Sequence, residues 1–404
     1  MSFRNNDWHN YILNDFIKYS SEKIDIEKIS EFNYISTENM LPNKGQIINA
    51  SSLPKSKTVT KYSIGDTLIS NIRPYFKKIW FANKIGGASN DVLVIKSDNA
   101  LVDKKFLYYL LSEDSFFDYV MLTSKGTKMP RGDKGAILNY KASLPPLKEQ
   151  KAIAKILSDL DEKIEVNNKI NKNLEEMAQA IFKQWFVDFE FPNEEGKPYK
   201  SSGGEMVESE LGMIPKGWEI SKLGNYIELY DSKRIPLSKN EREKREKIYP
   251  YYGAASLMDF VDDYIFEGVY ILMGEDGTVS DNLGYPILQY VWGKFWVNNH
   301  AHVIKGVLDI SEEFIYILLK NTNVKQIITG AVQPKINQKN LREVNIVMPV
   351  KKDIVKKYSD LVNKMFFKIR ILTDENERLE KLRDTLLPKL MSGEIRVPLE
   401  NSED

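Results

Sequence analysis

The chain has 404 residues, of which 42% are hydrophobic, so it can bury a substantial core and is long enough for two or more domains. It has no cysteine, which excludes a disulfide framework, a thiol nucleophile and any cysteine-ligated metal site. The formal net charge is zero, but residues 44–96 carry nine Lys or Arg against two acids, and residues 320–342 carry five against none. Two local basic zones of this kind favour a polyanionic partner despite the neutral total.

The N-terminal segment has polar and charged residues where a signal peptide requires an apolar core. No apolar run reaches the length of about 18 residues that a membrane helix requires. We therefore expect a cytoplasmic protein with no membrane partner.

Residues 1–147 are predicted to form a first globular domain. Trp8 precedes an alternating segment that is typical of a first strand, and YSIGDTLIS from Tyr62 and SNDVLVIK from Ser89 predict further strands. FLYYLL from Phe106 indicates the start of an apolar helix.

Two segments of this domain are candidates for contact with nucleic acid. NIRPYFKK combines positive charge with flat rings, and arginine is the commonest bidentate reader of guanine. The alternative is that its aromatic residues belong to the core and its lysines to a solvated edge. SKGTKMPRGDKG, from Ser124, is a basic loop with three glycines that suits phosphate contacts, the alternative being an ordinary surface loop. The candidate residues are Arg73, Tyr75, Lys77, Lys78, Lys125, Thr127, Lys128, Arg131 and Lys134.

Residues 148–189 are predicted to form one long helix that begins after Pro145 and Pro146. Apolar residues recur four and three positions apart, which is typical of a coiled-coil seam. Asn167 and Asn171 interrupt the seam, where they either fix the register or face solvent. The apolar seam residues include Ile153, Leu157, Leu160, Ile164, Leu174 and Ile181.

Residues 190–213 are predicted to form an exposed linker. The segment from Asn193 to Gly217 is rich in Gly, Ser, Pro and acidic residues, so it can bury little apolar surface.

Residues 214–349 are predicted to form a second domain that repeats the first. Trp218, YIFEGVYIL from Tyr264, NNHAHVIK from Asn298 and FIYILL from Phe314 align with first-domain segments at offsets between about 203 and 210 residues. GAVQP from Gly330 aligns with GTKMP from Gly126, and its loop has amide side chains that are suited to adenine edges. The glycine-rich segment 274–284 is acidic and lacks the Lys-Ser/Thr ending of a phosphate loop, and it is interpreted as a loop near the nucleic acid. The candidate residues are Gln333, Lys335, Asn337, Gln338 and Lys339.

Residues 350–391 are predicted to form a second long helix, followed by a tail at 392–404 that is frayed from Pro398 onward. Each helix of about 35 residues would be about 50 Å long, so each needs a partner, and each is the obvious partner of the other. An antiparallel pair would place Ile153 near Leu386, and Ile181 or Trp185 near Tyr358, with Asn376 as a further polar seam position. The apolar seam residues include Tyr358, Val362, Met365, Ile369, Leu372, Leu379 and Leu386.

The predicted fold is therefore of the α+β class. Two globular domains are separated by a long antiparallel two-helix coiled coil, with an internal pseudo-two-fold repeat.

No catalytic constellation can be assembled from these residues. The chain has no phosphate loop ending in Gly-Lys-Ser/Thr, and Leu144-Pro145-Pro146-Leu147 lacks the amide and the aromatic residue of the amino-methyltransferase tetrapeptide. His300 and His302 are expected to share one strand face and lack an evident third metal ligand, so we predict sheet-surface residues and no metal site.

LPPLKEQKAIAKILSDLDEKIEVNNKINKNLEEMAQAIFKQWFVDFEF, the joint KPYKSSGGEMVESELGMIPKGW and the closing LEKLRDTLLPKLMSGEI closely resemble the specificity subunits of type I restriction-modification systems. The resemblance covers essentially the whole chain, most strongly the helices and the joint. It implies two target recognition domains that each bind one half of a split, asymmetric double-stranded DNA site, with the helices setting the spacing.

The resemblance also implies partners and cofactors. Two methyltransferase (modification) subunits that use S-adenosylmethionine would dock on the helices, and restriction subunits that use ATP and Mg would join for translocation. This chain itself would be non-catalytic and hold no cofactor.

Two other functions remain open from the residues alone. One is a coiled-coil adaptor whose globular ends bind proteins, against which the two basic zones count. The other is an enzyme with an unrecognised active site.

Overall fold

The computed structural model describes residues 7–97, 100–307, 309–330 and 332–398. The chain divides into two compact units, Met1–Val166 with Asn376–Asp404, and Asn167–Glu375. Both boundaries fall inside the long helices, so each unit contains a globular domain together with part of each helix. The sequence had predicted the helices as segments of their own. Within the described ranges, no helix is both long and apolar enough to cross a membrane.

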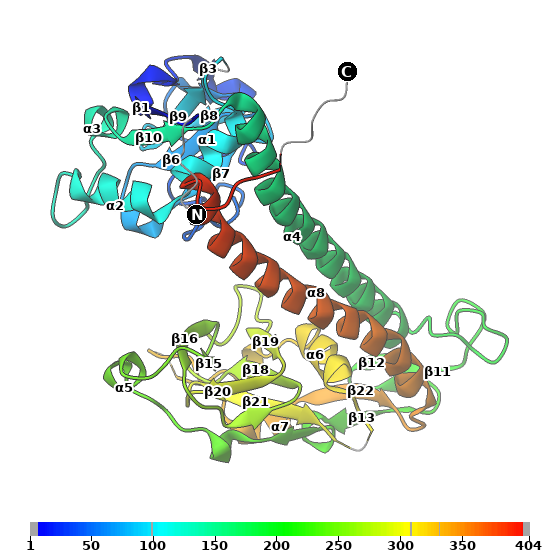
Figure 1. The fold of residues 1–404 in the computed structure, drawn as a ribbon. Helices are drawn as coiled ribbons and strands as arrows, with labels where there is room; N and C mark the ends of the chain where they lie inside the picture. Colours follow the sequence, from blue (N-terminus) through cyan, green and yellow to red (C-terminus); the bar gives the residue numbers. More distant parts are fainter. Residues whose placement is uncertain (1–6, 98–99, 308, 331, 399–404) are drawn as a thin grey trace. The chain divides into compact units, whose positions relative to one another are not determined.

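The first unit contains ten strands and three shorter helices among its described residues (Figure 1). The strands form one four-stranded sheet of order β2-β9-β6-β7, a second of order β3-β5-β8-β4, and the pair β1-β10. The elements are β1 (His9–Ile12), β2 (Ile17–Tyr19), β3 (Lys23–Asp25), β4 (Tyr34–Ile35), β5 (Thr58–Tyr62), β6 (Thr67–Ser70), β7 (Ile79–Phe81), β8 (Gly86–Ala88), β9 (Val92–Ser97), α1 (Lys104–Leu111), α2 (Asp114–Leu122), α3 (Lys134–Leu138) and β10 (Lys141–Leu144).

The second unit contains sheets of order β14-β21-β18-β19 and β16-β15-β20-β17, and the pairs β13-β22 and β11-β12. Its elements are β11 (Met206–Ser209), β12 (Gly212–Pro215), β13 (Trp218–Lys222), β14 (Ile227–Leu229), α5 (Lys239–Glu243), β15 (Tyr249–Tyr252), β16 (Leu257–Val261), β17 (Phe266–Glu267), β18 (Tyr270–Gly274), β19 (Leu288–Val291), β20 (Lys294–Val297), β21 (Ala301–Gly306), α6 (Glu312–Lys320), α7 (Gln338–Arg342) and β22 (Asn345–Pro349).

The two domains share most of their topology, which confirms the predicted internal repeat and the α+β class. The sheets β2-β9-β6-β7 and β14-β21-β18-β19 correspond strand for strand and are antiparallel throughout. In the other sheet a common trio, β5-β8-β4 or β17-β20-β15, contains one parallel pair in each domain. The fourth strand differs, because β3 extends the trio beside β5 whereas β16 extends it beside β15.

The same cap starts the apolar helix of both domains. Asp103 accepts a hydrogen bond from the amide of Phe106 at the start of α1, and Ser311 accepts one from Phe314 at the start of α6. Both phenylalanines are fully buried. Each cap satisfies an amide at the helix N-terminus that the helix leaves without a partner, so the sequence specifies where the helix begins.

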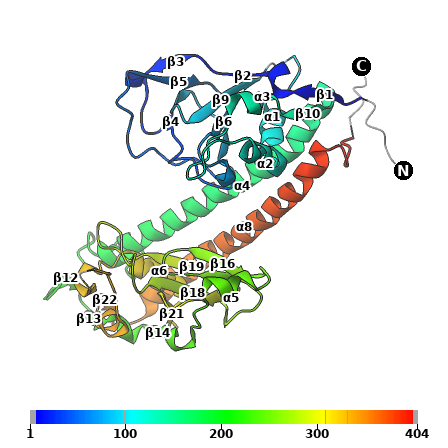
Figure 2. The same cartoon turned by 90° about the vertical axis from the view of Figure 1, so that its left-hand side faces the viewer.

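The long helices are α4 (Leu147–Phe182) and α8 (Asp353–Met391), and in each unit their segments lie side by side in opposite directions (Figure 2). In the first unit Ile153 and Leu157 belong to one core cluster with Leu386 and Leu390. In the second unit the ring centroids of Trp185 and Tyr358 lie 6.1 Å apart. Both contacts are the neighbours expected of an antiparallel pair.

All the seam positions named from the sequence are buried or half-buried. Asn167 is fully buried and donates to Glu375 at 2.8 Å, and Asn171 donates to Thr373 at 3.1 Å. Asn376 is also buried. The polar seam residues therefore do not face solvent, and their cross-helix hydrogen bonds suit a role in register.

The segment predicted as an exposed linker is mostly exposed, but it is folded. β11 and β12 form a hairpin, and Ile214 in β12 is buried in the core of the second domain. The Phe191 ring stacks on those of Tyr199 and Trp218, with centroids 4.6 and 5.2 Å away. Sequence composition missed this because a few large rings bury enough apolar surface to order a polar segment.

The tail is also partly ordered. Arg396 forms two hydrogen bonds with Glu149 at the start of α4, at 2.7 and 3.0 Å. The predicted fraying from Pro398 onward concerns residues that, beyond Pro398, lie outside the described ranges.

Candidate nucleic-acid interface

The two candidate segments of the first domain, far apart in sequence, form one surface. The amide of Arg73 donates to the carbonyl of Pro130 at 2.8 Å, and that of Gly132 donates to the carbonyl of Asn71 at 3.1 Å. Ile72 and Arg131 form an antiparallel bridge between these bonds. We name residues 71–78 and 124–135 together the first loop pair.

The second domain repeats this arrangement with residues 274–284 and 329–339, the second loop pair. The amide of Gly277 donates to Pro334 at 3.0 Å, and that of Ile336 donates to Glu275 at 2.9 Å. Asp276 and Lys335 form the bridge. Each residue that makes these contacts in the second loop pair lies 204 positions after its counterpart in the first loop pair. The repeat therefore extends to individual backbone hydrogen bonds, and we call this shared set of backbone contacts the frame.

Each loop turns at a glycine in the left-handed region. Gly126 has φ 90° and Gly330 has φ 87°, a conformation that glycine adopts without steric cost. The turns are closed by paired backbone hydrogen bonds, between Lys125 and Arg131 in one loop and between Thr329 and Lys335 in the other. The GTKMP and GAVQP alignment predicted from the sequence therefore corresponds to one shared turn.

In the first loop pair the aromatic side chains are exposed. Tyr75 is 46% and Phe76 is 37% accessible, with ring centroids 4.7 Å apart, so they are not core residues as the alternative interpretation held. Arg73 is exposed, and within the described part of the chain its guanidinium has no protein partner. This side chain is free to contact a ligand.

The lysines of this segment are partly engaged. Lys77 lies 2.9 Å and Lys44 lies 3.2 Å from the carboxylate of Asp114. Partial burial opposes ionisation of Asp114, but hydrogen bonds and attraction from the two lysines hold its pKa below the ordinary value. Lys78 donates to the carbonyl of Thr37 at 2.7 Å, and burial lowers its pKa.

Sequence reasoning missed the segment that packs against this loop. The amides of Asn43 and Lys44 donate to the carbonyls of Phe76 and Lys77 at 2.8 and 2.9 Å. Among the described residues, six non-glycine residues have positive φ, and Asn43, Lys44, Arg73 and Lys77 are four of them. Left-handed backbone at non-glycine residues is costly and clusters at functional sites.

The glycine loop of the first pair contains both paired and free cations. Lys125 lies 2.5 Å from Asp133, and Arg131 lies 3.1 Å from Asp91. The hydrogen bond from Lys125, together with amides at the start of α3, lowers the pKa of Asp133 to about 2. Among the described residues, three exposed side chains of this loop have no protein partner: Thr127, Lys128 and Lys134.

The second loop pair has a different set of side chains. Gln333 and Lys339 are exposed and unpaired within the described part of the chain, whereas Lys335 lies 3.3 Å from Glu275. The amides expected to bind adenine are partly occupied. Asn337 caps α7 by accepting from Asn340 at 2.8 Å, and Gln338 donates to Asp231 at 2.7 Å.

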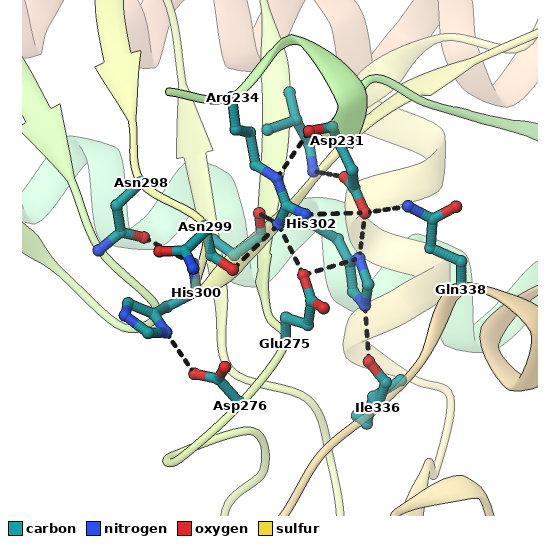
Figure 3. Close-up of polar contacts among 12 residues, drawn as sticks. Asp231, Arg234, Glu275, Asp276, Asn298, Asn299, His300, His302, Ile336 and Gln338 are labelled. Carbon is teal, nitrogen blue, oxygen red and sulfur yellow. Dashed lines mark hydrogen bonds and ion pairs between the residues drawn. The ribbon is translucent and has the colours of Figure 1, made fainter. Parts of the chain in front are cut away.

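A buried polar cluster lies beneath the second loop pair (Figure 3). His302, in β21, is fully buried, so the prediction that it lies on the sheet surface was wrong. His300 precedes the strand and is 2.7 Å from Asp276, so the two histidines do not share a strand face. Sequence reasoning could not find this cluster, because residues that are in contact within it lie far apart in the sequence. Gln338 and Asp231, for example, are hydrogen-bonded but 107 positions apart.

Three members of the cluster have metal-ligating atoms, since oxygens or nitrogens of Asp231, Glu275 and His302 lie within 4.8 Å of one another. The cluster already contains its own cations. Arg234 donates to Glu275 at 2.6 Å and lies 3.7 Å from Asp231. Because a fixed guanidinium occupies the place where a cation would be attracted, we interpret the group as an ion-pair network.

Both ring nitrogens of His302 are engaged. Nδ1 lies 2.6 Å from Asp231, and Nε2 donates to the carbonyl of Ile336 at 2.8 Å. Burial acts to raise the pKa of Asp231, but its bonds with His302 and the amide of Val303 hold that pKa below the ordinary value. The carboxylate is therefore charged and fully hydrogen-bonded.

Known proteins resemble this chain in sequence and in fold. The model of the type I restriction modification DNA specificity domain matches residues 5–176 and 215–381. A MjaIX specificity subunit of a type I restriction enzyme from Methanocaldococcus jannaschii is 30% identical over 73% of this chain and 70% of its own length. The HindI specificity subunit from Haemophilus influenzae is 24% identical over 96% of this chain and 100% of its own length.

A solved structure has a similar fold. The type I restriction-modification S subunit from M. genitalium aligns with a TM-score of 0.56 at 17% identity, over 96% of this chain and 98% of its own. At that identity the likeness concerns the fold alone.

Proposed function

Because this chain belongs to the type I restriction-modification DNA specificity family, whose members act in DNA sequence recognition, we propose that each of its domains binds one half of a bipartite, asymmetric DNA site. In this role the chain selects the sequence and performs no catalysis. Partner subunits that use S-adenosylmethionine would catalyse methyl transfer.

The proposal rests on two surfaces, one in each domain, that share the same backbone hydrogen bonds and differ in their side chains. The frame is the same hydrogen-bonded bridge in both domains, offset by 204 residues. The free side chains are Arg73 and Lys128 in one and Gln333 and Lys339 in the other. Arginine suits guanine and glutamine suits adenine, so the two half-sites should differ.

We further propose that the long helices set the spacing between half-sites. A helix of 36 residues, such as α4, is about 54 Å long, which is roughly the length of 16 base pairs of DNA at about 3.4 Å each. The buried seam and its cross-helix hydrogen bonds support a fixed register, which a spacer of defined length requires.

The exposed flanks of the helices are the proposed docking surface for two methyltransferase subunits. Apolar side chains remain exposed there, among them Val166 and Met177 on α4 and Phe367 and Ile371 on α8. Contiguous exposed apolar patches mark partner interfaces, and we propose that these side chains contribute to one. Their occurrence on both helices of a duplicated chain supports two copies of one partner.

Salt-dependent DNA binding by the complex with its methyltransferase partner tests the proposal. We expect affinity for duplex DNA to fall steeply with salt, since each displaced counterion contributes to the slope. A triple variant, Arg73→Ala, Lys128→Ala and Lys134→Ala, should flatten that slope. Binding that is absent, or insensitive to salt in both proteins, would favour the coiled-coil adaptor instead.

A further inference from the structure

The second loop pair is anchored to a buried charged network, whereas the corresponding place in the described first loop pair has one hydrogen bond, from the hydroxyl of Tyr19 to the carbonyl of Lys134 at 3.0 Å. The Ile336 peptide is bound on both sides, since its amide donates to Glu275 and its carbonyl accepts from His302. Two residues later, Gln338 donates to Asp231, which also binds His302. The loop is thus attached at its backbone and at one side chain to residues in the body of the domain (Figure 3).

The network is rigid because each of its charged groups is satisfied. Asp231 accepts from His302, Gln338 and the amide of Val303 in β21. Arg234 joins Glu275 to the carbonyl of Ala301, both at 2.6 Å. A buried polar network with every member bonded specifies one arrangement of its groups.

The first domain provides a matched comparison. Leu93 pairs with Ile69 in the sheet as His302 pairs with Met273, so leucine stands where the second domain has histidine. Gly132, the counterpart of Ile336, keeps its amide bond to Asn71. A leucine side chain cannot donate to the carbonyl of Gly132, so the first loop pair has the same amide bonds without the histidine anchor. The hydroxyl of Tyr19 instead donates to the carbonyl of Lys134, the counterpart of Gln338.

We propose that Asp231 and His302 are positioning residues for DNA recognition by the second domain. The pair fixes the backbone at Ile336 and the side chain at Gln338, and thereby sets where Gln333, Lys335 and Lys339 meet the DNA. This inference rests on the proposed function. It assigns a role in base discrimination to two buried residues that contact no DNA themselves.

The first test measures base discrimination by the complex with its methyltransferase partner. Binding is measured to duplexes that carry single-base changes in either half-site of the motif that the wild type methylates. His302→Leu, which introduces the residue of the first domain, should reduce discrimination at least tenfold in one half-site and less than twofold in the other. His302→Gln, whose amide can still donate to the carbonyl of Ile336, should restore most of it.

Unchanged discrimination in His302→Leu overturns the proposal. Equal loss in both half-sites also overturns it, because that pattern indicates general damage. The rescue by His302→Gln separates positioning from bulk stability, since both variants remove the same buried ring. If the wild-type complex discriminates at neither half-site, the proposed function fails, and that result is distinct from a failure of the anchor.

The second test needs no variant. It therefore tests the proposed anchor even in the case that His302→Leu does not fold. Hydrogen exchange is measured at the amides of Ile336 and Gly132, which make equivalent bonds in the two domains. We expect the protection factor of Ile336 to exceed that of Gly132 at least tenfold, because His302 holds the carbonyl of Ile336 and a leucine stands in the equivalent place beside Gly132. Equal protection at the two amides would contradict the proposal.

Discussion

Asp114 lies between two lysines of the first domain and neutralises positive charge at the border of the proposed DNA interface. Its carboxylate is 2.9 Å from Lys77 and 3.2 Å from Lys44, and both lysines border the first loop pair. A phosphate would compete with this carboxylate for the same two ammonium groups. In the proposed interface, Asp114 would therefore limit the affinity for DNA while it holds the two lysines in place.

Asp114→Asn should raise the affinity of the complex for duplex DNA about three- to tenfold at low salt and steepen the salt dependence, because two cations lose their internal partner. Fluorescence anisotropy between about 50 and 200 mM salt measures this effect. Asp118→Asn, on the same helix and without a partner among the described residues, is the matched control. Equal effects of the two variants would reject a specific role for Asp114.

The neighbouring Glu113 makes the stability of the first unit depend on pH. Burial raises its pKa from 4.5 to about 7, partly offset by Ser115 and Lys44. Between these two values the folded state keeps a proton that the unfolded state has released, so stability falls as pH rises toward 7 and is then constant. Glu113→Gln should remove this dependence and stabilise the unit by about 1–2 kcal/mol at pH 8. Thermal melts at pH 5 and 8 would show no difference between the two proteins if Glu113 titrates normally.

At the scale of elements, the start of α4 and the segment after α8 are joined by one buried ion pair. Glu149 has 2% side-chain exposure and is bound by Arg396 through two hydrogen bonds. Removing one partner of such a pair leaves an uncompensated buried charge. The tail after the last helix is therefore part of the first unit.

Arg396→Ala should lower the free energy of unfolding of the first unit by about 2–3 kcal/mol, as measured by denaturant titration. Lys389→Ala removes an exposed pair with Glu394 at 3.4 Å and should cost less than about 0.5 kcal/mol. Adding Glu149→Gln to Arg396→Ala should recover part of the loss. If Arg396→Ala alone were as stable as Lys389→Ala, the assignment of Glu149 and Arg396 as a stabilising buried ion pair would be wrong.

The elements that sequence alone predicts are those with a local pattern. The seam spacing predicts α4 and α8, and matching segments such as GTKMP and GAVQP predict the repeat. Only part of the candidate nucleic-acid interface can be predicted from the sequence. Asn43 and Lys44 reach the first loop pair through backbone bonds to residues 33 positions away, and His302 depends on Asp231, 71 positions away. Such pairings depend on tertiary packing and leave no periodic signal in the sequence.

At the scale of the whole molecule, the proposed function makes the chain a pair of DNA-binding domains built on one duplicated frame. The frames share their hydrogen bonds, whereas their free side chains and their anchoring differ. Duplication followed by divergence of exposed side chains gives two surfaces of unlike specificity without a change of fold.

Single substitutions should therefore affect one half-site each. Arg73→Ala should reduce base discrimination in the half-site of the first domain by about 1–3 kcal/mol, and Gln333→Ala should do so in the half-site of the second. Each variant is the control for the other, since each leaves the opposite loop pair intact. Competition binding with substituted duplexes measures both. Loss of discrimination spread over both half-sites would argue against separate readers.

The most direct measurement is a genome-wide map of methylated adenines in cells that express this chain with its methyltransferase partner. We predict one motif with two unlike specific halves, separated by a non-specific gap of constant length below about 16 base pairs. A continuous or palindromic motif, a gap of variable length, or no sequence-specific methylation would contradict it.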